Sequence, residues 1–347
     1  MPSFSPEEYR AARTGAALVD RSERGRIAAI GADRLAYLHA MLTNDILSLR
    51  PGTGCYAAYL TPQGRMIADM LVLELGDLTL LDVEASTRAV VLEKLEQFIF
   101  SEDVHLSDLT PGLAELRIAG PCAADVLASA GQGGGAASAA PLGAADLGAL
   151  REYDSLRASF QGSSVVMVAD RELGVPGFNL YLNREHAPAF EDALRASGAI
   201  EIGREVEEAL RIEAGRPRFG VDMDDATIPL EAGIENRAIS FTKGCFPGQE
   251  VITRVLHRGH GRVAKKLVGV RCEGEIVPSP GDALLAGDRE IGSVTSATTS
   301  PTLQRAIALG YVQRDFAAPG TAASIVHAGL RLPATVVDLP FVGPTPP

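Results

Sequence analysis

Tryptophan is absent from the sequence, and phenylalanine, tyrosine and tryptophan together make up only 5 % of it. A flat ligand would therefore be held mainly by other side chains. Cysteine is also scarce, and Cys55, Cys122, Cys245 and Cys272 lie far apart with no Cys-x-x-Cys pair among them. This spacing argues against a chain-local zinc or iron–sulfur site and against a scaffold built on disulfides.

Long apolar runs are missing as well. No stretch approaches the roughly 18 uncharged residues of a membrane-spanning helix, and the first residues lack the basic segment and apolar core of a secretion signal. We therefore expect a cytosolic (cytoplasmic) protein with no membrane partner. Positive charge is limited too, because 32 Lys and Arg face 44 Asp and Glu. This excess of negative charge disfavours a protein that binds nucleic acid over its whole surface, since phosphate binding needs Lys and Arg.

The composition that remains is that of a globular protein. The 347 residues are 46 % hydrophobic and 22 % charged, enough to bury two or three cores of ordinary domain size. Ser5 as N-cap, Pro6 in the first turn and Glu8 as the capping-box partner predict a helix that Gly15 ends. Between residues 55 and 127 short apolar strands alternate with helical stretches, which favours an α+β layer with a mostly antiparallel sheet.

The second half of the chain changes character twice. Gly and Ala dominate residues 129–149, and this composition predicts a flexible surface segment. Strand signals then resume, and helices are predicted at about 184–197 and 203–214. After Lys266 short β-rich segments alternate with Gly and Pro turns, so we expect a small C-terminal β-barrel.

The segment SFTKGCFPGQEVITRV, residues 240–255, is the most informative about chemistry. Cys245 must become a thiolate to attack or to bind metal, and the nearby ammonium of Lys243 favours that ionisation. Pro247 and Gly248 suit a type II turn that would fix the direction of the thiol. A buried cysteine beside a turn remains the other interpretation, because free cysteine usually fills core space.

The octet KGCFPGQE resembles the K-G-C-[YF]-x-G-Q-E signature of the YgfZ family, folate-linked proteins related to the T-protein of glycine cleavage. Other blocks of that superfamily have counterparts here in the same order. They are LTNDI at 42–46, LTPQGRMIAD at 60–69, ALRIEAGRPRFGVDM at 209–223 and IPLEAG at 228–233. The resemblance covers about residues 5 to 260, and beyond them the chain is similar only in its β-rich character.

This resemblance implies a three-lobed, T-protein-like α+β architecture, with ferredoxin-like antiparallel sheet layers and a C-terminal β-barrel around a central opening. It further implies that the opening receives tetrahydrofolate or another folate derivative, with the cysteine motif close by. The expected domains are a folate-binding-type lobe of residues 1–50 and 150–255, a ferredoxin-like lobe of residues 51–128, the flexible segment 129–149 and a barrel of residues 262–347.

The resemblance also implies a function, the support of assembly or repair of iron–sulfur enzymes, including one that thiomethylates transfer RNA. The expected partners are a folate-like small molecule and iron–sulfur client or assembly proteins, with an indirect link to tRNA modification. In this hypothesis Cys245 acts as a thiolate nucleophile or a transient metal ligand beside Lys243, and no resident metal is expected.

Asp69 is the candidate that strand geometry supports. It alternates with Ala68 and Met70 and would face inward among apolar neighbours. The resemblance implies that Asp69 orients a folate nitrogen. The structural alternative is an ion pair with Arg65 on the same strand face, which would leave the carboxylate ionised and inert.

Further folate-site candidates follow from the resemblance. In the relatives a Glu binds the N–H edge of the pterin, and the position of that Glu corresponds to Asn179 here, which can form hydrogen bonds but carries no charge. An Arg of the relatives corresponds to Glu207, so the charge at this position is reversed. Glu213 either lines the opening or caps and pairs within the structure. Gln249, in the cysteine motif, completes the set of candidates.

Two alternative functions remain open. One is a folate-dependent aminomethyltransferase or demethylase, in which Asp69 would hold the folate nitrogen or receive a proton. The other is a binding module whose basic run, residues 254–266, docks a partner protein or RNA, although such runs are usually solvated strand edges. His257 and His260 within this run are too few to specify a metal site.

Overall fold

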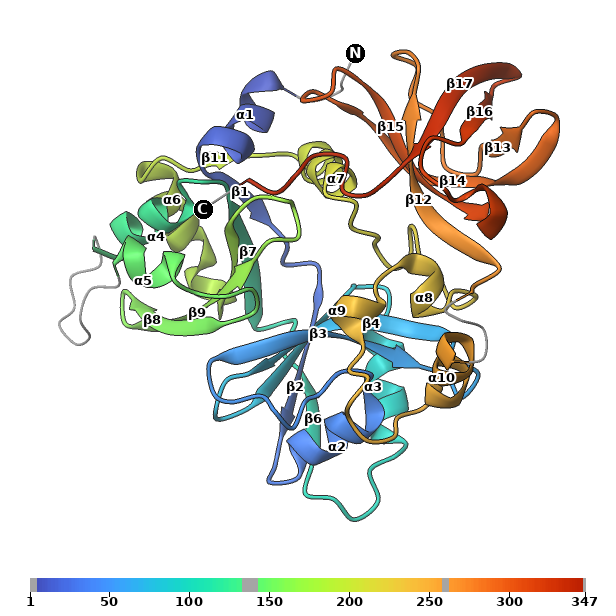
Figure 1. Ribbon diagram of the computed structural model, residues 1–347. Coiled ribbons are helices and arrows are strands. Elements are labelled where there is room, and N and C mark those ends of the chain that lie inside the picture. Colours follow the sequence, from blue (N-terminus) through green and yellow to red (C-terminus); the bar gives the residue numbers. More distant parts are fainter. Residues whose placement is uncertain (1–4, 133–142, 258–261, 346–347) are drawn as a thin grey trace.

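The computed structural model describes residues 5–132, 143–257 and 262–345. Within these residues the chain forms a six-stranded sheet, a five-stranded sheet and a closed barrel. Each belongs to a separate lobe, and Figure 1 shows the three lobes meeting around α7 (Arg204–Glu213) and α9 (Glu235–Ala238). The expected α+β class with a C-terminal β-barrel is confirmed.

The six-stranded lobe has the strand order β11-β1-β7-β10-β9-β8. Its strands are β1 (Ala17–Asp20), β7 (Leu113–Ala119), β8 (Ser155–Phe160), β9 (Ser163–Asp170), β10 (Gly177–Asn183) and β11 (Ile200–Glu201). Its helices are α1 (Pro6–Thr14), α4 (Ala123–Gln132), α5 (Ala144–Gly148), η1 (Arg184–His186), α6 (Ala187–Ala196) and α7. Leu116, Leu180 and Phe190 pack between the sheet and α4 to α6. On the other side Val19 and Leu210 form a second core with α1 and α7.

The first helix begins as the sequence predicts. Ser5 caps it by accepting a hydrogen bond from the Glu7 N–H at 3.2 Å, and Gly15 follows its last residue. Glu8 does not close a capping box, because its Oε2 accepts from the backbone N–H of Gly203 at 2.8 Å. This carboxylate instead joins α1 to the residue that precedes α7.

The five-stranded lobe has the strand order β3-β4-β5-β2-β6, with antiparallel neighbours throughout. Its elements are β2 (Gly25–Ile30), α2 (Arg34–Met41), β3 (Thr53–Leu60), β4 (Met66–Glu74), β5 (Thr79–Val83), α3 (Arg88–Glu96) and β6 (His105–Asp108). The order β6-β2-β5-β4 is ferredoxin-like, and β3 extends the sheet at one edge. Leu38, Val72 and Leu95 pack beneath α2 and α3.

The opposite face of this sheet is covered by three short helices, α8 (Pro229–Ala232), α9 and α10 (Gln249–His257). Leu71 of β4 shares a core with Ile234 and Ile252 of this segment. The cysteine motif lies between α9 and α10, so this packing fixes its position on the five-stranded lobe.

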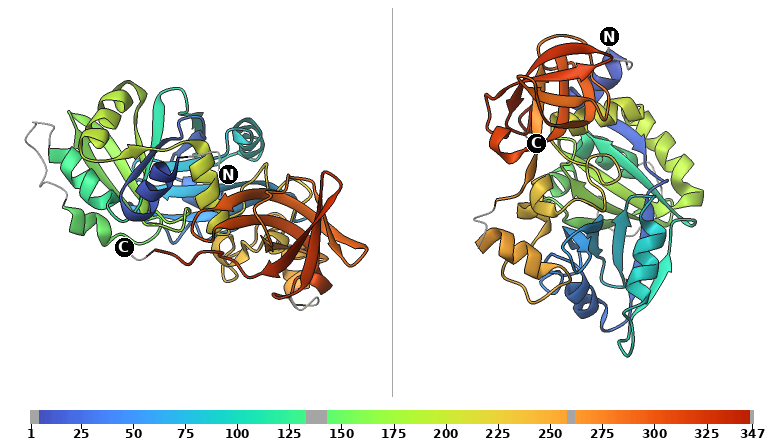
Figure 2. Two further views of the ribbon diagram at one scale, coloured as in Figure 1. Left: turned by 90° about the horizontal axis from the view of Figure 1, so that it is seen from above. Right: turned by 90° about the vertical axis from the view of Figure 1, so that its right-hand side faces the viewer.

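The barrel closes in the order β12-β15-β14-β13-β16-β17. Its elements are β12 (Lys265–Cys272), β13 (Ala283–Ala286), β14 (Arg289–Ser300), β15 (Arg305–Gln313), η2 (Arg314–Phe316), β16 (Ala322–His327) and β17 (Leu330–Val337). Val270, Ile325 and Val336 fill its interior. Figure 2 shows the barrel at one end of the molecule and the five-stranded lobe at the other. None of the helices in the described ranges is long and apolar enough to cross a membrane.

The lobe boundaries differ from the expected ones. β2 and α2 lie in the five-stranded lobe rather than with residues 150–255, because β2 pairs with β5 and β6. β7 and α4 lie in the six-stranded lobe rather than with residues 51–128, because β7 pairs with β1 and β10. Strand pairing, not proximity along the chain, thus decides which lobe a segment joins.

The Gly/Ala-rich segment 129–149 is described only at its two ends. α4 continues to Gln132 and α5 begins at Ala144, so both flanks are helical. Residues 133–142 lie outside the described residues, and the flexibility expected for them stays a prediction.

Candidate functional site

A cavity of about 650 Å³ lies where the three lobes meet, and we call it the central cavity. Its wall combines residues of the six-stranded lobe, the α8–α9 segment, β12 and the C-terminal segment. Charged side chains on this wall are Glu152, Arg171, Arg216, Glu235, Arg237, Lys266 and Asp338. Leu267, Val268 and Val342 add apolar surface. A volume of this size and mixed lining is typical of a site for a small organic ligand.

Asp69 lies at a second, much narrower cavity of about 20 Å³, the Asp69 cavity. The Tyr56 hydroxyl donates to Asp69 Oδ2 at 2.6 Å. Arg65, the alternative partner considered from the sequence, is exposed and donates to the backbone oxygen of Ala226 instead. Asp69 therefore faces a cavity, as expected, but it is half-buried and its surroundings are mainly charged and polar rather than apolar. Its partner is a tyrosine of the neighbouring strand and not an arginine of its own.

The environment of Asp69 changes its acidity. Burial raises the pKa of the Asp69 carboxyl to about 6, and the nearby Glu84 acts in the same direction. The hydrogen bond from Tyr56 opposes this rise because it favours the ionised carboxylate. A carboxyl with such a pKa can hold or release a proton near neutral pH, which is the property of a general acid or base.

Tyr56→Phe is expected to raise the pKa of Asp69 further, by about one pH unit, because the carboxylate loses its hydroxyl donor. The measurement is a titration of the aspartate carboxyl ¹³C signals, with Asp69→Asn used for assignment. Tyr59→Phe serves as the control, because the Tyr59 hydroxyl contacts the Lys94 backbone oxygen and not Asp69. An unchanged or lowered pKa in Tyr56→Phe would contradict the role given to this hydrogen bond.

Arg237 links the two cavities. Its guanidinium carbon lies 4.7 Å from the centre of the Tyr56 ring, and its Nη2 donates to the Tyr153 hydroxyl at 2.7 Å. Arg237 also lines the central cavity. A chain of contacts thus runs from the wall of the central cavity through Arg237 and Tyr56 to the carboxyl of Asp69.

Sequence reasoning missed both Tyr56 and Arg237. The signal for Tyr56 was present, since it lies on the strand preceding Asp69 and alternates toward the same face. The contact could not be derived from the sequence, however, because the register between β3 and β4 shifts at an irregularity between Tyr59 and Leu60. Arg237 has no local signal, because its partners are far away in the sequence.

The structure brings Asn179 and Glu207 together around one arginine. Arg117 Nε donates to Asn179 Oδ1 at 2.9 Å, and its Nη1 lies 3.2 Å from Glu207 Oε1. Arg21 approaches the same Glu207 oxygen at 3.5 Å. Asn179 is fully buried. The negative charge at position 207 is thus compensated by two arginines, and Asn179 has its amide oxygen occupied.

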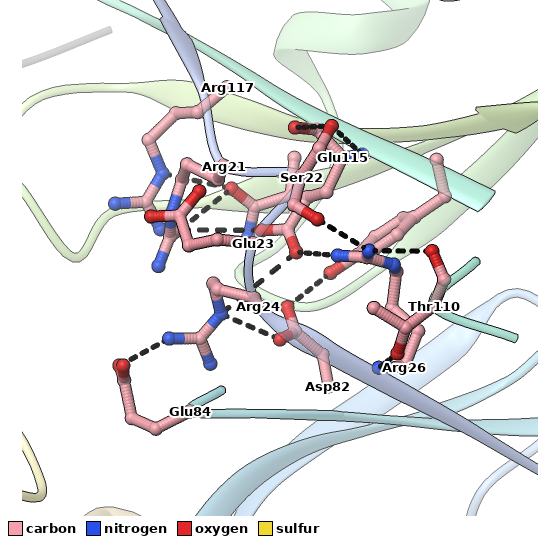
Figure 3. A network of polar contacts seen from close by, with 12 residues as sticks. Arg21, Ser22, Glu23, Arg24, Arg26, Asp82, Glu84, Thr110, Glu115 and Arg117 are labelled. Carbon is pink, nitrogen blue, oxygen red and sulfur yellow. Dashed lines mark hydrogen bonds and ion pairs between the residues drawn. The ribbon is translucent and has the colours of Figure 1, made fainter. Parts of the chain in front are cut away.

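These residues belong to a buried network of ion pairs, part of which is drawn in Figure 3. The fully buried Glu115 lies 3.5 to 3.9 Å from guanidinium nitrogens of Arg21, Arg24 and Arg26. Burial raises the pKa of Glu115 despite these cations, and the neighbouring Asp82 adds to the rise. Arg24 binds Asp82 as well, at 2.7 Å. Glu115 belongs to β7 of the six-stranded sheet, whereas Arg26 and Asp82 belong to β2 and β5 of the five-stranded sheet. The network therefore connects the two sheets.

The turn predicted in the cysteine motif is confirmed. The Gln249 N–H donates to the Phe246 oxygen at 3.2 Å, and Gly248 has a φ of +82°, as the third residue of a type II turn requires. A Cβ at Gly248 would lie 2.6 Å from the Thr61 oxygen. The motif therefore packs closely on the turn between β3 and β4, and it holds Cys245 exposed at the surface.

Gly248→Ala is expected to lower the free energy of unfolding by about 1–3 kcal/mol, because alanine disfavours this backbone conformation and its Cβ meets Thr61. Chemical denaturation measures the change. Gly244→Ala is the matched control in the same loop, since a Cβ there meets nothing within 4 Å. Equal stability of the two variants would show that the loop does not depend on this close approach.

Lys243 has a different role from the one expected. Its Nζ donates to the backbone oxygens of His39 and Leu42, at the end of α2. Burial lowers the pKa of Lys243 to about 8. Among the contacts of the described residues, the ammonium is committed to these carbonyls and not to the Cys245 sulfur. Lys243 therefore anchors the motif on α2 rather than activating the thiol.

Glu213 is structural and not a lining residue of either cavity. Its fully buried carboxylate accepts hydrogen bonds from the Tyr9 hydroxyl at 2.7 and 2.8 Å. Arg13 and the Ser300 hydroxyl also donate to it. The capping and pairing interpretation thus describes Glu213. Gln249 lies half-buried at the start of α10, and its backbone N–H closes the turn.

The basic run is described only in part. Arg254 and Arg262 are exposed, and Lys266 reaches the central cavity, whereas residues 258–261 lie outside the described residues. The side chain of His257 is likewise outside the description, as is His260. In the described part of the chain, no group of three or more His, Cys, Asp or Glu side chains is placed to hold a metal ion.

Comparison with family models accounts for nearly the whole chain. The GCVT N-terminal domain matches residues 1–243, and the glycine cleavage T-protein C-terminal barrel domain matches residues 265–343. The second match coincides with the closed barrel of the structure. Both models describe the T-protein and carry nothing specific to the YgfZ proteins.

Individual relatives agree with the family models. An aminomethyltransferase of Streptomyces coelicolor is 34 % identical over 342 residues, which cover 96 % of this chain and 88 % of that protein. One of Geobacillus kaustophilus is 33 % identical over 342 residues, covering 96 % and 89 %. The crystal structure of glycine cleavage system aminomethyltransferase T from Bartonella henselae has the same fold, with a TM-score of 0.86 at 22 % identity, covering 99 % of this chain and 95 % of that one. The chain therefore belongs to the glycine cleavage T-protein family.

Proposed function

We propose that this chain binds a reduced folate in the central cavity and transfers a one-carbon unit between that folate and an amine. The relatives from S. coelicolor and G. kaustophilus are both named aminomethyltransferases. The observation that carries the proposal is the Asp69 carboxyl, which Tyr56 holds at 2.6 Å and which has a pKa of about 6. Such a group exchanges its proton near neutral pH, as transfer at an amine nitrogen requires.

The wall of the central cavity suits a folate. A folate has a heteroaromatic head with N–H donors and a carbonyl, and a tail that carries carboxylates. Glu235 Oε2 and Arg237 Nε on this wall are buried and have no hydrogen-bond partner among the described residues, so they are suited to the head. Arg171 and Lys266 offer positive charge for the tail, and Leu267 offers apolar surface.

In this proposal the folate supplies, when bound, the nitrogen that carries the one-carbon unit. The reacting nitrogen of this folate has to extend from the central cavity into the Asp69 cavity, where Asp69 in its ionised form accepts an N–H of the ligand or takes up a proton released there. Tyr56 occupies Oδ2 and thereby holds the carboxylate in one orientation. Arg237 keeps the Tyr56 ring in place by stacking on it at 4.7 Å.

The experiment is to incubate the full chain with tetrahydrofolate and aminomethyl carriers as donors, and to follow methylenetetrahydrofolate and the ammonia released from the aminomethyl group. Steady production is expected, and Asp69→Asn should reduce it by about a hundredfold or more. Asp77→Asn is the control, because it alters an exposed carboxyl that pairs with Arg157 on the surface. The absence of product from the unaltered chain with every donor would refute the proposal.

A second function, support of iron–sulfur enzymes in the manner of YgfZ proteins, is favoured by one specific observation. Cys245 is exposed in a loop that the turn at Gly248 and the anchor at Lys243 hold in place. A thiol presented in this way is accessible to a partner protein, whereas Cys272 is buried in the barrel. Iron–sulfur client or assembly proteins, including those of tRNA thiomethylation, are the partners of this candidate function.

The test of this second function is complementation of cells that lack the native protein. Cys245→Ala and Cys245→Ser are expected to fail to restore an iron–sulfur-dependent activity such as tRNA thiomethylation. Cys122→Ser is the control, since this half-buried cysteine lies in the six-stranded lobe, away from the motif. Full rescue by both Cys245 variants would remove the thiol from the function.

A further inference from the structure

We propose that Tyr153 and Arg237 are positioning residues that set the proton affinity of the Asp69 carboxyl. Tyr153 holds the guanidinium of Arg237 over the ring of Tyr56. The cation in turn strengthens the hydrogen bond that the Tyr56 hydroxyl donates to Asp69. The inference rests on the proposed function, because it concerns the group that exchanges a proton there. It adds two residues that were not among the candidates suggested by the sequence.

The first step is the contact between Arg237 and the ring of Tyr56. The guanidinium carbon lies 4.7 Å from the ring centre, within the range of a cation–π interaction. A cation at the ring face stabilises negative charge on the phenol, so the phenolic O–H becomes a stronger donor. Burial raises the pKa of Tyr56 well above its usual value, whereas Arg237 acts in the opposite direction. The electrostatic effect of Arg237 on Tyr56 thus has the sign that the proposal requires.

The second step is the hydrogen bond between Tyr56 and Asp69. The Tyr56 hydroxyl donates to Asp69 Oδ2 at 2.6 Å, and this bond lowers the pKa of Asp69 against the larger effect of burial. A stronger donor favours the ionised carboxylate more. Loss of the cation over the ring of Tyr56 should therefore raise the pKa of Asp69.

Tyr153 fixes the position of Arg237. The guanidinium Nη2 donates to the Tyr153 hydroxyl at 2.7 Å. The Nε of Arg237 is buried and has no hydrogen-bond partner in the described part of the chain. The bond to Tyr153 and the contact with the Tyr56 ring therefore together determine where the charge lies. Without the Tyr153 hydroxyl the guanidinium would keep its charge but lose this anchor.

The backbone at Tyr153 is itself unusual. Its φ is +70°, which residues other than glycine rarely adopt, and such conformations persist only where the surroundings hold them. The Tyr153 N–H donates to the Ala169 oxygen at 2.8 Å. On the other side a Cβ at Gly54 would lie 3.1 Å from the Tyr153 oxygen. Gly54 belongs to β3, the strand that carries Tyr56. The contact between the six-stranded and five-stranded lobes thus places the anchor of Arg237.

Other charged groups also surround Asp69. Those that line the Asp69 cavity are Arg21, Arg24, Asp82, Glu84, Glu172 and Arg218. Burial is the largest cause of the raised pKa of Asp69, and among these groups Glu84 and Glu172 add to it while Arg24 opposes it. All of them are kept in the variants proposed below, so a difference between variants reports on Tyr153, Arg237 and Tyr56.

The test is a titration of the aspartate carboxyl ¹³C signals in the full chain without ligand. Arg237→Gln is expected to raise the pKa of Asp69 by about half a pH unit or more. Tyr153→Phe, which keeps the size of the ring and the charge of Arg237, should cause a smaller rise in the same direction. Arg157→Gln is the control, because this exposed arginine pairs with Asp77 at the surface. An unchanged pKa of Asp69 in Tyr153→Phe would overturn the role of Tyr153.

The same substitutions in a Tyr56→Phe background show by which route they act. Phenylalanine keeps a ring beneath the guanidinium but donates no hydrogen bond to Asp69. Arg237→Gln and Tyr153→Phe should therefore lose most of their effect on the pKa of Asp69 in this background. An equal rise in both backgrounds would show that Arg237 acts on the carboxyl directly, and the positioning role of the two residues would be wrong.

Turnover gives a second readout. Because the ionised form of Asp69 is the one that takes up the proton, the acid limb of the pH–rate profile should move to higher pH in Tyr153→Phe, by the same amount as the pKa. A uniform loss of rate with an unmoved profile would contradict the inference. A chain that transfers no one-carbon unit refutes the proposed function instead, and the titration of Asp69 still decides whether Tyr153 and Arg237 set its proton affinity.

Discussion

Asp69→Asn is expected to stabilise the folded chain at neutral pH while it removes one-carbon transfer. Asparagine keeps the shape of the side chain and an oxygen that can accept from Tyr56. Asparagine carries no charge, whereas burial disfavours the ionised carboxylate of Asp69. Because burial raises the pKa of Asp69 from 3.8 to about 6, ionisation costs free energy in the folded chain that it does not cost in the unfolded chain.

The gain in stability depends on pH in a defined direction. Below pH 3.8 the carboxyl is protonated in both states, and the comparison with asparagine shows little difference. Between pH 3.8 and about 6 the unfolded chain loses this proton first, so the contribution of Asp69 to stability falls as pH rises. Above pH 6 the loss is complete and amounts to at most about 3 kcal/mol. The stability of Asp69→Asn should therefore increasingly exceed that of the unaltered chain as pH rises through this window, and the difference should be constant above it.

Urea denaturation from pH 3.5 to pH 8 measures this effect, with Asp77→Asn as the exposed control. Asp77 pairs with Arg157 at the surface, so its replacement should bring no gain at neutral pH. Equal stability of Asp69→Asn and the unaltered chain at pH 7.5 would mean that Asp69 is ionised in the folded chain without cost. The result would then contradict its assignment as a proton-exchanging group. A more stable but inactive variant is the pattern of a site that retains strain for function.

Local chemistry made several features of this protein predictable. The turn of the cysteine motif follows from Pro247 and Gly248, whose backbone preferences admit few other conformations. The first helix follows from Ser5 and Gly15 at its ends. The inward orientation of Asp69 follows from strand alternation alone. In each case the physical cause lies within a few residues of the feature.

The partners of these residues could not be predicted, because they depend on strand pairing. Arg117 compensates Glu207 and occupies Asn179, and it does so because Asn179 and Arg117 face each other across β10 and β7. Tyr56 reaches Asp69 only in the register that pairs Ala58 with Asp69. The lobe boundaries failed for the same reason, since β2 joins β5 and β6 rather than the segments next to it in the expected domain.

Lys243 shows a further limit of reasoning from spacing. The separation of two residues from Cys245 suggested activation of the thiol, but a long side chain can reach partners far along the chain. Its ammonium binds carbonyls at the end of α2, where a helix presents unpaired oxygens and partial negative charge. The sequence does not reveal these carbonyl acceptors, because α2 and the cysteine motif come together only in the folded chain.

Replacement of Glu213 is expected to destabilise the protein more than any surface change, by about 3–5 kcal/mol in Glu213→Ala. The carboxylate receives hydrogen bonds from Tyr9 and Arg13 of α1 and from Ser300 of β14. It therefore joins the six-stranded lobe to the barrel at the end of α7. Its removal leaves the Arg13 charge without its buried partner.

Glu213→Gln separates charge from shape in the same site. Glutamine fills the same space, but its amide nitrogen places a donor where Arg13, Tyr9 and Ser300 already donate. We therefore expect this variant to lose roughly half or more of the stability that Glu213→Ala loses. Glu205→Gln, an exposed position on the same helix, should be neutral. Denaturation followed by tyrosine fluorescence measures all three variants, and a loss below about 1 kcal/mol in Glu213→Ala would show that α7 docks on the barrel through its apolar contacts alone.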